Sequence, residues 1–269
     1  MKPLHSVFFL TAFVLLVGLA CSALSGGGTP PTQPPPPTQE PVQVLPTESL
    51  PEPTEVPPTE SLPPTATEPP VPQAQQFFTE EFDNPLSGDW NTLTVTGSDK
   101  ADPDKVTVEA ENGNLVWNFD SEEVYYYLFY NAFDYEDVRL DVRADNRGRN
   151  NNLVSLICRY NADEGWYEFN IANSGIYVVY YGYETSDGSI AYDRIANGGS
   201  LAIKQGKEVN EYGISCKDNE LTLYINGKEE ISLTENKYGL RSGQVGISVS
   251  SLNVLPILIE MDWVKISEP

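Results

Sequence analysis

Residues 153–183, LVSLICRYNADEGWYEFNIANSGIYVVYYGY, decide the fold class because apolar and polar side chains alternate along them in short runs. The runs 153–160, 166–172 and 175–183 are separated by segments containing Asn, Asp and Gly. A period of two places successive side chains on opposite faces of a strand. This stretch therefore predicts three consecutive β-strands, each with one face turned toward a core.

The same pattern continues on both sides of this stretch. Asn226-Gly227 separates two short apolar runs and favours a two-residue hairpin turn, because both positions tolerate positive φ. No segment of residues 76–269 has apolar side chains three and four positions apart over ten residues, as an amphipathic helix would. The sequence therefore predicts an all-β fold, a two-sheet antiparallel jelly-roll sandwich. Further strands are expected at residues 105–111, 114–120, 123–130, 137–144, 244–250 and 257–266.

Composition divides the chain into three parts. Residues 76–269 contain all four Trp and all fifteen Tyr, and they alone are able to bury a core. Residues 30–72 hold 17 of the 22 prolines and lack Trp, Tyr, Phe, Lys and Arg. Proline favours extended polyproline II structure, so residues 22–75 are predicted to be a disordered, proline-rich tether. Residues 1–21 are expected to form a signal peptide that ends at Cys21.

The signal peptide is indicated by an apolar run at residues 7–20 that follows Lys2. The run is too short to span a bilayer, which takes about 20 apolar residues. The segment Gly18-Leu19-Ala20-Cys21 resembles the lipobox of bacterial lipoproteins, although Gly18 and Leu19 reverse the usual order. The resemblance implies an extracytoplasmic protein held at the cell surface by a lipid on Cys21. Ordinary secretion with cleavage nearby is the alternative.

Charge and the scarcity of histidine exclude several function classes. Residues 76–269 carry 33 acidic and 15 basic side chains, a charge near −18 that repels nucleic acid and anionic lipids. Membrane contact is therefore expected through the lipid anchor only. The single histidine, His5, belongs to the signal peptide, so Ser–His and Cys–His nucleophile pairs are excluded from the sandwich. Neutral glycans and cationic surfaces remain as ligands.

Two cysteines remain once Cys21 is assigned to the anchor. Cys158 and Cys216 each end an alternating run, so both are expected to face the core. An exported domain lies in an oxidising compartment, where the two are able to bond. A disulfide across 58 positions would stabilise the fold by roughly 4 kcal/mol in the loop-entropy model. Two reduced core thiols are the alternative.

Several segments spread over residues 77–266 resemble the concanavalin A-like lectin/glucanase sandwiches, particularly the laminin-G-like domains of bacterial lipoproteins. The segments are Glu80-Glu81-Phe82-Asp83, Cys158-Arg159-Tyr160, Trp166-Tyr167-Glu168-Phe169, Leu223-Tyr224-Ile225-Asn226-Gly227, Gly243-Gln244-Val245-Gly246 and Met261-Asp262-Trp263-Val264. The resemblance assigns this fold to residues 76–269. It also implies a structural calcium ion (Ca2+) held by oxygen atoms of Glu81, Gly113 and Asp262. The alternative is that Asp262 is simply solvated.

The resemblance also raises the question of catalysis. Glucanases of this superfamily carry the pattern Glu-x-Asp-x-x-Glu on one strand, which supplies a nucleophile and an acid. Glu81-Phe82-Asp83 and Glu260-Met261-Asp262 match only its first half, because Leu86 and Lys265 occupy the third position. The sequence therefore predicts that the protein is not an enzyme.

A sugar-binding surface needs aromatic rings bordered by hydrogen-bonding groups. If Tyr167 and Phe169 face the core, alternation places their neighbours on the opposite face. The sequence predicts a non-catalytic surface lipoprotein whose lectin-like sandwich binds carbohydrate there. The alternative functions are a laminin-G-like protein-interaction module on a stalk and a glycoside hydrolase-like enzyme. The alternative role of the aromatic rings is packing between neighbouring strands. The residues predicted to bind the ligand are Trp166, Arg159, Glu168, Tyr127 and Tyr181.

Overall fold

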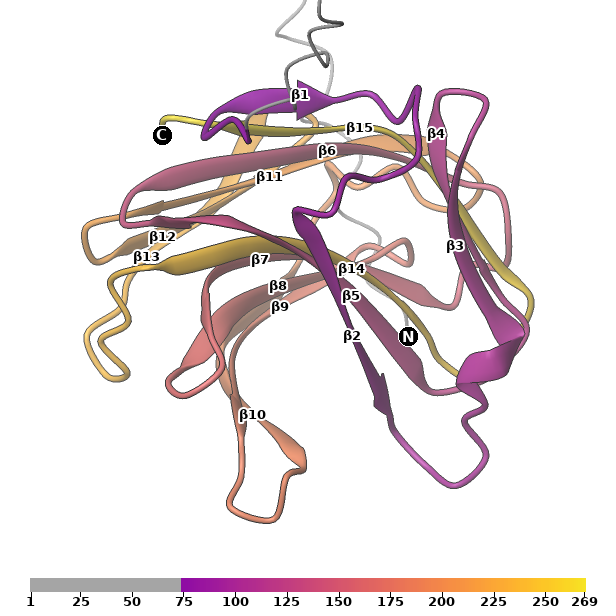
Figure 1. Cartoon of the computed structure of the whole chain (residues 1–269), viewed down its shortest axis with the longest axis horizontal. Helices are drawn as coiled ribbons and strands as arrows, with labels where there is room; N and C mark the ends of the chain where they lie inside the picture. Colours follow the sequence, from indigo (N-terminus) through magenta and orange to yellow (C-terminus); the bar gives the residue numbers. More distant parts are fainter. Residues whose placement is uncertain (1–73) are drawn as a thin grey trace, which may run out of the picture. The chain divides into compact units, whose positions relative to one another are not determined.

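A computed structural model describes residues 74–269, which fold into two antiparallel β-sheets packed face to face (Figure 1). The predicted all-β sandwich is confirmed. The only helical element in this range is a turn of 3-10 helix, η1 (Pro103–Lys105). None of the described residues belongs to a helix with the length and apolarity to cross a membrane. The predicted signal peptide, Cys21 and nearly all of the tether lie outside the described residues.

Eight strands form the first sheet: β1 (Phe78–Glu80), β3 (Val106–Glu111), β4 (Asn114–Phe119), β6 (Val138–Asn146), β11 (Val209–Lys217), β12 (Glu220–Ile225), β13 (Lys228–Thr234) and β15 (Ile257–Ser267). Their order is β13-β12-β11-β6-β15-β4-β3, and β1 pairs with β15 beside this path. Asn226 and Gly227 form the predicted turn between β12 and β13, with φ of 50° and 76°.

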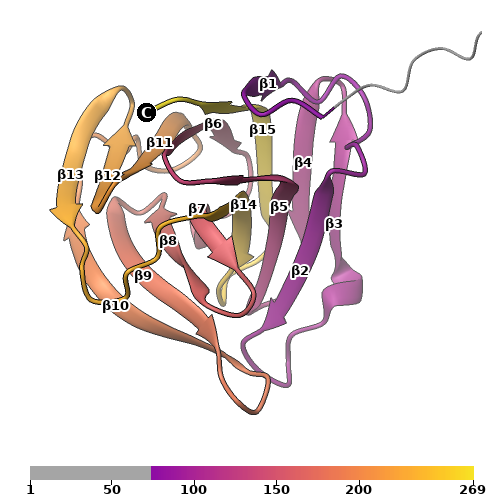
Figure 2. The same cartoon turned by 60° about the vertical axis from the view of Figure 1, so that its left-hand side comes forward.

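Seven strands form the second sheet: β2 (Trp90–Thr96), β5 (Val124–Tyr135), β7 (Asn152–Asn161), β8 (Gly165–Ala172), β9 (Ile176–Glu184), β10 (Ile190–Gly199) and β14 (Gly243–Ser251). Their order is β10-β9-β8-β7-β14-β5-β2. The stretch that decides the fold class supplies β7, β8 and β9, which pair antiparallel in sequence order. Figure 2 shows β10 and β2 at opposite edges of this sheet, with the other five strands between them.

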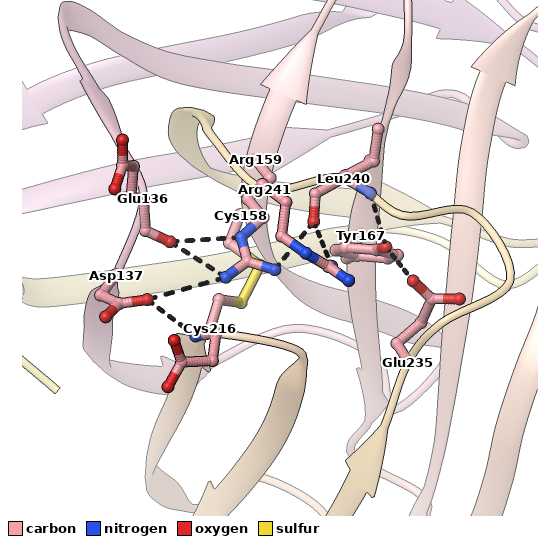
Figure 3. The surroundings of a disulfide bond; sticks show 10 residues. Glu136, Asp137, Cys158, Arg159, Tyr167, Cys216, Glu235, Leu240 and Arg241 are labelled. Carbon is pink, nitrogen blue, oxygen red and sulfur yellow. Dashed lines mark hydrogen bonds and ion pairs between the residues drawn. A yellow bond between two sulfur atoms is a disulfide. The ribbon is translucent and has the colours of Figure 1, made fainter.

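The hydrophobic core lies between the two sheets. From β8 it receives Tyr167, Phe169 and Ile171, all fully buried, as the alternation predicts. Cys158 of β7 and Cys216 of β11 are joined by a disulfide, with 6.6 Å between their Cα atoms (Figure 3). The bond therefore connects the second sheet to the first through the core.

The outer face of the second sheet is concave. Four strands separate β5 from β10, so five inter-strand spacings would place them about 24 Å apart in a flat sheet. The hydroxyl oxygens of Tyr127 on β5 and Tyr192 on β10 are nevertheless only 2.7 Å apart. The sheet must therefore curve strongly, and in Figure 1 its edge strands β2 and β10 bend away from the first sheet. The curvature gathers side chains from distant strands over the centre of this face.

Candidate active site

A pocket of about 360 Å³ lies on the concave face, above β8. Glu168 and Asn170 point into it because Tyr167 and Phe169 occupy the core side of the same strand. Among the described residues that line the pocket, Glu168 alone has a carboxyl group. The pocket therefore combines one acidic group with a mainly aromatic and aliphatic wall. Its lining residues are Tyr125, Leu153, Glu168, Asn170, Val178, Tyr180 and Tyr192.

The Glu168 carboxyl is almost completely buried, with 1% of the residue exposed. It accepts a hydrogen bond of 2.9 Å from Nε1 of Trp166, and the hydroxyl of Tyr127 lies 3.3 Å from each of its oxygens. Burial raises the pKa of Glu168 from 4.5 to about 7, and these hydrogen bonds act in the opposite direction. A carboxyl with a pKa near neutrality is suited to take a proton from a bound molecule and to return it.

Two tyrosine hydroxyls extend the hydrogen bonding away from Glu168. The hydroxyl of Tyr127 contacts both the carboxyl and the hydroxyl of Tyr192, which lies 2.7 Å away. Burial, followed by the nearby charge of Glu168, raises the pKa of both tyrosines well above the usual value. Both phenols therefore remain protonated near neutral pH and act as hydrogen-bond donors.

Trp166 lies on the predicted face but not at its surface. The residue is 2% exposed, and its ring packs against those of Tyr160 and Tyr192, with centroid distances of 5.6 and 6.1 Å. The indole fits because Gly182 lies opposite on β9, where a Cβ atom would be 2.5 Å from Cε2 of Trp166. The expectation of an exposed ring is wrong. The structure shows Trp166 orienting the Glu168 carboxyl through Nε1–H.

Arg159 does not reach the concave face, so its expected placement there is wrong. A register shift in β7 between Cys158 and Asn161 interrupts the alternation, and Arg159 has a φ of 55°. Its side chain lies instead beside the disulfide, near Glu136 and Leu240 (Figure 3). There it is 1% exposed and donates hydrogen bonds to the carbonyl oxygens of Glu136 at 3.0 Å and Leu240 at 2.9 Å. Arg159 therefore holds two connecting segments together.

Neither Tyr181 nor Tyr127 presents an exposed ring on the predicted sugar-binding face. Tyr181 lies on the core side of β9, because Tyr180 faces the pocket. It stacks on Tyr238 with 4.0 Å between ring centroids, and its hydroxyl donates to the carbonyl oxygen of Glu164. Tyr127 is on the concave face but is fully buried. The structure therefore brings together Trp166, Glu168 and Tyr127, without the other two predicted residues.

Tyr192 is a residue of this site that the sequence did not predict. It belongs to the edge strand β10, which has no buried residue and no alternation of buried and exposed positions. No local pattern therefore predicted this strand. The position of Tyr192 above Glu168 depends on the curvature of the sheet, for which the sequence of β10 gives no signal.

The predicted calcium ligands Glu81, Gly113 and Asp262 differ in their surroundings in this structure. The Asp262 carboxylate is engaged in an ion pair with Arg143, and Glu81 is exposed. Gly113 lies in the turn between β3 and β4. Within residues 74–269, no three or more His, Cys, Asp or Glu side chains gather where they would hold a metal. Calcium binding stays a prediction, and a calcium ion at Asp262 would compete with Arg143 for its carboxylate.

The curved sheet with a pocket on its concave face places the domain in the concanavalin A-like lectin/glucanase class. Residues 78–257 match the model of the family described as the 3-keto-alpha-glucoside-1,2-lyase-like domain. The chain belongs to this family. A comparison with curated protein sequences gave no match.

Solved structures share the fold at low sequence identity. A Bacillus licheniformis β-glucanase is 13% identical, with a TM-score of 0.51 over 73% of this chain and 100% of the glucanase. A Bacteroides ovatus mixed-linkage glucan hydrolase of glycoside hydrolase family 16, in complex with a G4G4G3G product, is 12% identical, with a TM-score of 0.51 over 71% and 99%. A structure described with the endo-acting O-glycanases of human gut microbiota is 14% identical, with a TM-score of 0.50 over 71% and 98%. These similarities establish the common fold.

Membership in a lyase-like family contradicts the prediction of a non-catalytic binding protein. That prediction rested on the incomplete Glu-x-Asp-x-x-Glu pattern and on the absence of histidine from residues 76–269. Both criteria describe hydrolases that use two carboxyl groups or an activated nucleophile. An elimination needs neither, because one group able to take up a proton is sufficient for it. The prediction was wrong because it tested only hydrolytic mechanisms.

Proposed function

We propose that the protein is an enzyme that cleaves 3-keto-α-glucosides by elimination, with Glu168 as the general base. The observation that carries this proposal is the buried Glu168 carboxyl in the pocket, with a pKa of about 7. A ketone at C3 of the sugar makes the hydrogen on C2 acidic. Glu168 removes that proton, the C1–O bond to the leaving group breaks, and a C1–C2 double bond forms.

The composition of the pocket favours elimination over hydrolysis. Retaining and inverting glycosidases both use two carboxyl groups, about 5 Å apart in the retaining enzymes. Glu168 is the only carboxyl among the described pocket-lining residues. An elimination requires a single base, and the family name describes a lyase of this kind.

The remaining lining residues suit a neutral sugar. Tyr125 and Tyr180 offer aromatic surface for the sugar ring, and Asn170 offers an amide for its hydroxyl groups. The fold neighbours from Bacillus licheniformis and Bacteroides ovatus are named for glucans, which are also neutral glycans. The strong negative charge of the domain disfavours uronic acids and sulfated sugars as substrates.

The proposed function is tested with p-nitrophenyl α-glucoside and its derivative oxidised at C3. We expect the purified protein to release p-nitrophenol from the 3-keto compound and to leave the parent glucoside intact. Mass spectrometry of the sugar product separates the two reactions, since the elimination product lacks the water that hydrolysis adds. A hydrated sugar product, or cleavage of the unoxidised glucoside alone, would refute the proposal.

The proposed location is the outer side of a bacterial membrane, with a lipid on Cys21. Cys21→Ser should release the protein from the membrane or leave its precursor uncleaved, because the thioether to the lipid forms only on a thiol. Fractionation and immunoblotting of wild type and variant measure this. Normal processing with unchanged membrane retention would exclude the anchor.

A further inference from the structure

Two titratable side chains line the same pocket and are connected by hydrogen bonds behind it. Glu168 and Tyr192 both belong to the pocket wall, whereas Tyr127 does not. The Tyr127 hydroxyl bridges them, at 3.3 Å from the carboxyl oxygens and 2.7 Å from the Tyr192 hydroxyl. We refer to these three residues as the hydroxyl relay. Its two ends face the substrate space, and its middle is shielded from it.

We propose that Tyr192 is the general acid of the elimination and that Tyr127 returns the proton from Glu168 to Tyr192. The inference rests on the proposed function. An alkoxide is a poor leaving group, so breaking the C1–O bond is accelerated when a donor protonates the departing oxygen. Tyr192 lines the pocket and belongs to the same hydrogen-bonded set as the base.

The relay closes the proton balance without another reactant. Glu168 takes the proton of C2, and the C2–H electron pair forms the double bond while the C1–O pair leaves with the oxygen. The hydroxyl of Tyr192 gives its proton to that oxygen. Tyr127 then passes its proton to the Tyr192 oxygen and takes one from Glu168. The carboxylate and both phenols are restored, with no water consumed and no change of redox state.

The packing supports this role for Tyr192 in preference to the other pocket tyrosines. Its ring is held edge-on by Trp166 and Tyr180, with centroid distances of 6.1 and 5.6 Å. Tyr125 and Tyr180 also line the pocket, but neither hydroxyl makes a hydrogen bond to another described side chain. A proton from Glu168 therefore has a hydrogen-bonded path to Tyr192 alone among these three.

The test is Tyr192→Phe on two 3-keto-α-glucosides that differ only in the leaving group. Because methoxide is a poor leaving group, cleavage of the methyl glycoside is strongly accelerated by protonation of its oxygen, whereas p-nitrophenolate leaves readily without it. We expect kcat to fall about 100-fold or more on the methyl glycoside and by less than about threefold on the p-nitrophenyl glycoside. An equal loss on both substrates would indicate a packing role, and no loss would exclude Tyr192 as the acid; either result overturns the inference.

Tyr127→Phe and a matched control complete the test. Tyr127→Phe breaks the relay without changing the pocket wall and should also slow the methyl glycoside more than the p-nitrophenyl glycoside. Tyr126→Phe removes a hydroxyl from the adjacent residue, which packs against Trp117 on the opposite face of β5, and should leave both rates unchanged. A Tyr127→Phe enzyme with full activity on the methyl glycoside would overturn the relay. Wild-type protein inactive on both substrates would instead refute the proposed function.

Discussion

Replacing Glu168 with Gln is expected to lower kcat/KM for the 3-keto glucoside at pH 8 by about a thousandfold or more. Glutamine has the shape of glutamate but cannot take up the C2 proton. Its amide oxygen still accepts the hydrogen bond from Nε1 of Trp166, so the packing of the site is retained. The rate of p-nitrophenol release measures the loss. A variant that keeps a tenth of the wild-type rate would rule out Glu168 as the base.

The wild-type enzyme should show the ionisation of this carboxyl in its pH profile. Burial raises the pKa of Glu168 to about 7, and the carboxylate is the form that acts as a base. We therefore expect kcat/KM to fall about tenfold per pH unit below 7 and to level off above it. Glu168→Asp should keep this slope with a rate about 100-fold lower, because the carboxylate retreats by one methylene.

The stability of Glu168→Gln separates a catalytic defect from a folding defect. The carboxyl has a higher pKa in the folded protein than the 4.5 expected when unfolded, so the folded state holds the proton more tightly. The stabilisation that comes from this tighter proton binding is complete below about pH 4.5 and is lost as the pH rises through about 7. Removing the charge should make Glu168→Gln more stable than wild type at pH 8, by the order of 3 kcal/mol. Urea unfolding of both proteins at pH 5 and pH 8 measures this difference.

Local alternation was sufficient to predict part of the site. Trp166, Glu168 and Asn170 share one face of β8. Tyr167 and Phe169 point into the core, and alternation along a strand places their neighbours on the opposite face. The same rule failed for Arg159, one position after a run that it described correctly. A β-bulge exchanges the faces of a strand, and the residues around Arg159 contain no signal for one.

The rest of the site depends on tertiary structure. Tyr192 meets Tyr127 only because the sheet curves, and curvature is a property of the whole sheet. The acid–base character of Glu168 likewise comes from burial beneath residues on other strands. A single glutamate in a strand has an ordinary pKa until those strands cover it. This is why the sequence predicted Glu168 as a ligand-binding residue and gave no reason to propose it as a base.

Reduction of the Cys158–Cys216 disulfide is expected to lower the free energy of unfolding by about 4 kcal/mol. The bond closes a loop with a sequence separation of 58 residues and links β7 to β11 across the core. The disulfide restricts the conformations of the unfolded chain. Reduction restores them and thereby stabilises the unfolded state. Guanidinium unfolding with and without reductant measures the change as a shift of the midpoint.

The double variant Cys158→Ala, Cys216→Ala is the control for this experiment. Its midpoint should not respond to reductant, and it should fall at or below that of the reduced wild type, since both sulfur atoms leave fully buried positions. Reduction should also loosen the guanidinium of the adjacent Arg159, whose carbonyl partner Glu136 precedes the strand that pairs with β11. Identical midpoints for oxidised and reduced wild type would show that the packing of the two sheets holds the core without the covalent link.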